Sequence, residues 1–189
     1  KGVCGFRVDA IGNIKKNLVL DRYPADGPDG LCYAGTWIQN QPGIEDFLTE
    51  MKERTLKPHN SMTVAEVGVP EERLEEFVGK DGFFSMVFDF SYTDIDVPDS
   101  AEWFVPTGWT VKDIRDNLFH SQTATQAIGW GAVYLENHDQ PRSINKYIPE
   151  ADINRYSKTM LGTLFMMLRG TPFIYQGQEL GMENVKFES

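Results

Sequence analysis

Residues 135–142 read LENHDQPR, and they close an apolar run that extends from Trp130 to Leu135. A short apolar run bounded by polar residues predicts a buried strand. His138, Asp139 and Arg142 would then emerge at the carboxyl end of that strand. Parallel barrels keep their catalytic groups at this end of their strands. The stretch therefore predicts both a fold and the edge at which its chemistry lies.

Two further apolar segments end in a carboxylate: VCGFRV (residues 3–8) precedes Asp9, and MTVA (residues 62–65) precedes Glu66. Side chains two residues apart in a strand point the same way, so Arg7 and Asp9 are expected to lie side by side. An arginine keeps a neighbouring carboxylate ionised and oriented, as a nucleophile requires, although a structural ion pair would give the same pattern. Asp9, Glu66 and Asp139 each follow a predicted strand, so all three acids are expected at the same edge of the sheet.

The rest of the chain alternates between helical and strand patterns. We expect helices over residues 43–57, 70–79, 110–128 and 153–168, and two more strands over residues 83–90 and 172–175. The third helix can begin with a capping box formed by Thr110 and Asp113. Alternation of this kind predicts a parallel sheet with helices outside it.

The number of strands sets the extent of the fold. Five strands are too few for a closed eight-stranded barrel, which has about 250 residues. The predicted fold class is therefore α/β, a partial (β/α)8 TIM barrel holding about strands 4 to 8. Residues 1–189 would form a fragment of a single catalytic barrel domain.

Composition restricts the possible partners. The 189 residues carry a net charge of −10, which argues against nucleic acid or an anionic membrane and favours a neutral or cationic ligand. No apolar run approaches the roughly 18 residues of a membrane span. Cys4 and Cys32 are the only cysteines, and Cys4 is expected to be a buried free thiol. No spacing suggests a metal site or a cofactor. Met166 and Met167 are interpreted as core filler.

Paired carboxylates at one rim indicate glycoside hydrolysis, which uses a carboxylic acid together with an ionised carboxylate. With Asp9 as nucleophile and Glu66 as general acid and then base, the anomeric configuration would be retained. The two carboxyl groups would then lie roughly 5–5.5 Å apart. Asp139 could bind sugar hydroxyls and sharpen the distortion of the ring. This chemistry needs no cofactor.

Four ordered motifs resemble those of the α-amylase family, glycoside hydrolase family 13, and most closely its α-glucosidase and oligo-1,6-glucosidase branch. They are GFRVDAI (5–11), TVAE (63–66), ENHDQPR (136–142) and RGTPFIYQGQELGM (169–182). The strands that precede these motifs in the family, its first conserved motif and the β-sandwich that follows its barrel have no counterpart in this sequence. Gln178 stands where the family commonly has glutamate.

The resemblance implies a role for each matching residue. Asp9, Glu66 and Asp139 would be the catalytic acids, Arg7 and His138 would orient the substrate, and Arg142 would lie near the aglycone side of the pocket. The residue after the nucleophile is associated with linkage preference in this branch. Ala10 in that position favours α-1,4 over α-1,6 bonds, because a small side chain leaves room on the aglycone side.

Three functions remain open at this stage. The first is a retaining α-glucosidase that removes terminal glucose from maltose- or isomaltose-type oligosaccharides in the cytoplasm of a bacterium. The second is a transglucosylase or a sucrose or trehalulose-type isomerase on the same fold, although Gln140 after Asp139 looks more like the hydrolase branch. The third is a catalytically incomplete fragment, inactive by itself, that acts only as a binding or structural barrel. A phosphorylated disaccharide is a further possible substrate. An incomplete barrel would expose strand edges, so self-association is also expected.

Overall fold

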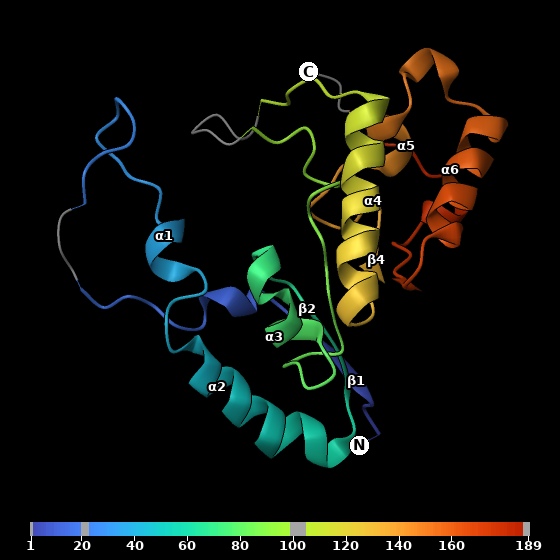
Figure 1. The fold of residues 1–189 in the computed structure, drawn as a ribbon. Coiled ribbons are helices and arrows are strands. Elements are labelled where there is room, and N and C mark those ends of the chain that lie inside the picture. Colours follow the sequence, from blue (N-terminus) through green and yellow to red (C-terminus); the bar gives the residue numbers. More distant parts are fainter. Residues whose placement is uncertain (1, 20–22, 99–104, 187–189) are drawn as a thin grey trace. The chain divides into compact units, whose positions relative to one another are not determined.

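The chain folds into two compact units in the computed structural model, which describes residues 2–19, 23–98 and 105–186 (Figure 1). The amino-terminal unit comprises residues 1–88 and 96–108. The carboxy-terminal unit comprises residues 89–95 and 109–189. Each unit contains a parallel sheet and several helices.

The amino-terminal unit is built on a parallel sheet of three strands in the order β1 (Gly5–Val8), β2 (Met62–Ala65) and β3 (Met86–Val87). Its helices are α1 (Gly35–Ile38), α2 (Ile44–Met51) and α3 (Leu74–Val78). Single 3₁₀ turns cover Ile11–Asn13, Lys57–His59 and Glu71–Arg73. Strand and helix therefore alternate, as the sequence pattern predicts.

The helix predicted over residues 43–57 is present, but its turns change along its length. It begins after Gly43, whose φ of 84° is left-handed and suits glycine. The coil continues beyond α2 (Figure 1), as a π-helical turn over Lys52–Leu56 and a 3₁₀ turn over Lys57–His59. Ile44 and Leu48, four residues apart on one helix face, are fully buried and anchor α2.

The carboxy-terminal unit has a two-stranded parallel sheet of β4 (Ala132–Val133) and β5 (Thr171–Pro172). Its helices are α4 (Val111–Ile128), α5 (Ser143–Tyr147) and α6 (Arg155–Met167), with 3₁₀ turns over Glu150–Asp152 and Gln178–Leu180. The core of this unit is a single cluster of buried side chains from strands, helices and the segment before α4: Tyr92, Leu118, Val133, Leu135, Ile144, Tyr147, Leu161 and Phe165.

Capping explains where the two long helices begin. The Thr110 N–H donates to Asp113 Oδ2 at 2.8 Å, and the Asp113 N–H donates to Thr110 Oγ1 at 3.3 Å, which confirms the predicted capping box of α4. The hydrogen bond from the Thr110 hydroxyl lowers the pKa of Asp113. A second capping box at α6, between Asn154 and Ser157, was not predicted.

Several predictions of burial are wrong. Cys4 is exposed: its carbonyl oxygen accepts the Met62 N–H at 2.9 Å, so its backbone pairs with β2, but its side chain is not covered. Met166 and Met167 are 58% and 80% exposed. Helix α6 buries Leu161 and Phe165 instead. Its apolar residues occupy several faces, so periodicity alone did not identify the face that packs.

Helices α1 and α5 were not predicted. The strands predicted over residues 83–90 and 172–175 are shorter than expected.

Candidate active site

Strands β1 and β2 bring Arg7, Asp9 and Glu66 together. Val8 pairs with Ala65 in the parallel register, so Asp9 and Glu66 are the next residues at the carboxyl ends of adjacent strands. Arg7 lies between their side chains: its Nη1 forms an ion pair with Asp9 Oδ1, and its Nη2 lies 2.7 Å from Glu66 Oε1. The arrangement has two carboxylates held by one guanidinium, as the sequence led us to expect for Arg7 and Asp9.

The backbone after β1 also fixes the orientation of Glu66. Ala10 is left-handed, with φ 41° and ψ 36°, an uncommon conformation for a residue with a side chain. This turn aims the Ala10 N–H at Glu66 Oε2, 3.1 Å away. Both oxygens of Glu66 therefore have a donor, and its side chain is only 20% exposed. The Asp9 side chain is 71% exposed, which leaves it accessible to a ligand.

In the carboxy-terminal unit, His138 and Asp139 form a second polar pair just after the segment that contains β4. His138 Nε2 lies 3.0 Å from Asp139 Oδ2, and both side chains are more than half exposed. The pair converges because the chain turns here: Asn137 Oδ1 accepts the Asp139 N–H at 2.8 Å, which is an Asx turn. The turn therefore brings together two adjacent side chains that would point to opposite sides of an extended strand.

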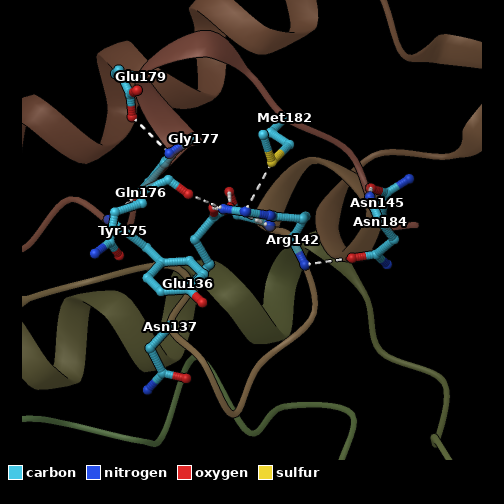
Figure 2. Close-up of polar contacts among 12 residues, drawn as sticks. Glu136, Asn137, Arg142, Asn145, Tyr175, Gln176, Gly177, Glu179, Met182 and Asn184 are labelled. Carbon is cyan, nitrogen blue, oxygen red and sulfur yellow. Dashed lines mark hydrogen bonds and ion pairs between the residues drawn. The ribbon is translucent and has the colours of Figure 1, made fainter.

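Arg142 lies in a polar network whose centre, the ion pair with Glu136, is largely buried (Figure 2). Its Nη1 donates to Glu136 Oε1 at 2.7 Å and to the Gln176 carbonyl oxygen at 2.8 Å. Its guanidinium also lies over the Tyr175 ring, 4.8 Å from the centroid. The arginine thus ties the segment after β4 to the segment after β5. An aglycone contact for Arg142 stays a prediction.

Sequence reasoning did not assign a role to Glu136, although the residue stands in the stretch that decided the fold. Its side chain is 1% exposed. The available signal was a carboxylate directly after an apolar strand and six residues before an arginine, which allows an ion pair but does not by itself indicate burial.

Two features are absent from the described residues: a cluster of metal-ligating side chains and a helix that could span a membrane. Among them, no three or more His, Cys, Asp or Glu side chains gather as a set of metal ligands would. No helix within residues 2–19, 23–98 and 105–186 is both long and apolar enough to cross a membrane.

Parallel strands alternating with helices define an α/β protein, and in the amino-terminal unit Asp9 and Glu66 follow the carboxyl ends of adjacent strands, where barrels of this class carry their catalytic groups. Comparison with known proteins identifies the family. The model of the α-amylase catalytic domain matches residues 1–189, and the chain belongs to this family. The predicted fold class, part of a (β/α)8 barrel, is confirmed with it.

Three relatives show how the similarity is distributed. The Bacillus subtilis protein named "Probable oligo-1,6-glucosidase 3" is 40% identical over 196 residues, covering all of this chain and 34% of that protein. Trehalose-6-phosphate hydrolase from Bacillus licheniformis has a solved structure that is 33% identical, with a TM-score of 0.80 over 98% of this chain and 33% of that one. Isomaltulose synthase from Erwinia rhapontici is 28% identical, with a TM-score of 0.83 over 99% and 33%. The chain spans about a third of the length of the relatives it matches.

Proposed function

We propose that this chain carries the catalytic acids of a retaining α-glucosidase, which cleaves terminal α-glucosidic bonds in glucose oligosaccharides through a covalent glucosyl-Asp9 intermediate. The observation that carries the proposal is the pair of carboxylates, Asp9 and Glu66, bridged by Arg7 at the ends of adjacent parallel strands. Family membership supports it, and so does the name oligo-1,6-glucosidase borne by the relative from Bacillus subtilis.

The reaction gives Asp9 the role of nucleophile and Glu66 two successive roles, first general acid and then general base. Asp9 attacks the anomeric carbon while Glu66, in its protonated form, donates a proton to the departing oxygen. Glu66 then takes a proton from water, and that water releases glucose from Asp9 with net retention. Asp139 and His138 would hold sugar hydroxyls and favour the distorted ring of the oxocarbenium-like transition state.

Two glucosidic linkages, α-1,4 and α-1,6, remain candidates for the bond that the protein cleaves. Ala10 favours α-1,4 bonds by the family association, whereas the curated relatives that match the chain include several named oligo-1,6-glucosidases. The named similarity to a trehalose-6-phosphate hydrolase also keeps a phosphorylated disaccharide among the candidate substrates. Comparing turnover of maltose, isomaltose and trehalose 6-phosphate would rank the three.

Transfer of glucose to a sugar is the second candidate function. The structural similarity to isomaltulose synthase supports it, since the TM-score of 0.83 is as high as that of the hydrolase. Gln140 after Asp139 favours hydrolysis. Product analysis with sucrose decides between them, because an isomerase would release mainly isomerised disaccharide and a hydrolase would release glucose. The presence of Asp9, Glu66 and Asp139 argues against a barrel that only binds in the whole protein, but not against an incomplete barrel that is inactive by itself.

The test of the main proposal is release of nitrophenol from p-nitrophenyl α-glucoside, compared with the Asp9→Asn variant. Replacing the nucleophile should lower kcat by at least about a thousandfold, because the amide cannot form the covalent intermediate. The matched control is Asp116→Asn, which changes an exposed carboxylate on α4 that pairs with Lys112 and should leave kcat unaltered. Equal rates for the wild-type protein and Asp9→Asn would refute the assignment.

A further inference from the structure

Glu136 is the only carboxylate among the buried polar side chains of the described residues. It is 2% exposed and lies directly after the buried Leu135. Removing a carboxylate from water costs several kcal/mol unless hydrogen bonds and an opposite charge compensate. A buried charge therefore needs well-placed partners, and the identity of those partners indicates what the charge holds in place.

All partners of Glu136 are donors on two consecutive residues. Its Oε1 accepts from Arg142 Nη1 at 2.7 Å. Its Oε2 accepts from the Ser143 N–H at 2.7 Å and from the Ser143 hydroxyl at 2.6 Å. Residues 136 and 142–143 thus close the base of a short loop, residues 137–141. His138 and Asp139 lie on that loop.

Arg142 also contacts the segment after β5. Its Nη1 donates to the Gln176 carbonyl oxygen, its Nη2 contacts Met182 Sδ at 3.0 Å, and its backbone N–H donates to Asn184 Oδ1 at 2.8 Å (Figure 2). The Asn184 N–H in turn donates to Asn145 Oδ1 at 2.6 Å. Because the charge of Glu136 holds Arg142, it also holds this second segment.

We infer that Glu136 is a positioning residue for His138 and Asp139: its buried charge fixes both ends of the loop that presents them. The inference rests on the proposed function, in which Asp139 acts on the sugar ring in the transition state. Glu136 itself acts only through the residues it holds. Loss of its charge frees the base of the loop, and a displacement of about 1 Å at a catalytic group can lower a rate about a hundredfold.

The decisive variant is Glu136→Gln, which keeps the shape of the side chain. Glutamine has one oxygen and one NH2 group, so whichever way it is turned, its NH2 group faces either the Arg142 guanidinium or the Ser143 N–H. We expect kcat for p-nitrophenyl α-glucoside to fall roughly tenfold to a hundredfold while KM changes less than about threefold. This split follows because Asp139 contributes mainly in the transition state.

The matched control is Glu150→Gln, the same substitution at an exposed ion pair with Lys186 in the same unit. It should change neither constant. Unchanged kcat in folded Glu136→Gln would overturn the inference. If Glu136→Gln does not fold, Ser143→Ala removes one of the three hydrogen bonds and leaves the ion pair. It should lower kcat about threefold, and an unaltered kcat would overturn the inference equally.

Hydrogen exchange gives a readout that does not depend on turnover. In Glu136→Gln, amide exchange should accelerate at residues 137–143, including the Asp139 N–H, and remain as in the wild-type protein over α4. Faster exchange spread over the whole unit would show a merely structural role and would overturn the inference. If the wild-type protein cleaves no α-glucoside, the proposed function fails, and exchange at residues 137–143 still decides whether Glu136 holds the loop.

Discussion

At the scale of single residues, the position of Asp9 depends on a glycine. Gly5 pairs with Met62 across β1 and β2, and a Cβ at Gly5 would lie 2.6 Å from the Met62 carbonyl oxygen. That oxygen is backbone and cannot rotate away. Gly5→Ala should force the two strands apart and lower the free energy of unfolding by about 1–3 kcal/mol, measured by urea denaturation.

Gly68→Ala is the matched control for this prediction, because nothing lies within 4 Å of a Cβ at that position. The alanine restricts the unfolded chain, so stability should stay equal or rise by a few tenths of a kcal/mol. A similar loss of stability in both variants would contradict the steric argument. It would show instead that both substitutions destabilise the protein for a reason other than the contact with the Met62 carbonyl oxygen.

At the scale of elements, the start of α4 offers a direct test of capping. Thr110→Ala removes the side-chain acceptor of the Asp113 N–H and should cost about 1 kcal/mol of stability, read from the shift in the urea midpoint. Thr123→Ala, the same substitution in the middle of α4, is the control and should be neutral or slightly stabilising, because alanine favours helix. Equal losses would mean that the cap contributes nothing specific.

The elements also show what the sequence could predict. The order of strands and helices, the α4 cap and the meeting of Arg7 with Asp9 follow from periodicity and from local hydrogen bonding, which act over a few residues. The buried face of α6 does not, because Leu161 and Phe165 are selected by what packs against them. Burial of Glu136 likewise requires Arg142 and Ser143 to come back to it through a turn, and no local pattern encodes that.

At the scale of the whole molecule, the comparisons show the family, while α-glucosidase activity, self-association and a cytoplasmic location stay predictions. A loss of stability at alkaline pH can be derived from two buried tyrosines, Tyr134 and Tyr92. Tyr134 is 2% exposed, and its hydroxyl lies 2.6 Å from Thr93 Oγ1. Burial raises the pKa of Tyr134 above its ordinary value of 10.0, and burial raises the pKa of Tyr92 in the same way.

The sign of the pH dependence follows from where the protons are held. Below pH 10 the phenol of Tyr134 is protonated in both the folded and the unfolded chain. Its contribution to the free energy of unfolding is therefore fully present in this range. Above pH 10 the unfolded chain loses the proton and the folded chain keeps it. Stability should therefore fall by up to about 1.4 kcal/mol per pH unit for each such tyrosine.

Tyr134→Phe isolates this contribution. At pH 8 the variant should be about 1 kcal/mol less stable than the wild-type protein, because Thr93 loses its hydroxyl partner. Between pH 10 and 11 that difference should shrink by about 1 kcal/mol, since the phenylalanine has no proton to hold. Tyr156→Phe, at a position 83% exposed on α6, should follow the wild-type curve throughout. Curves for Tyr134→Phe and the wild-type protein that stay parallel from pH 8 to 11 would show that the buried phenol does not control alkaline unfolding.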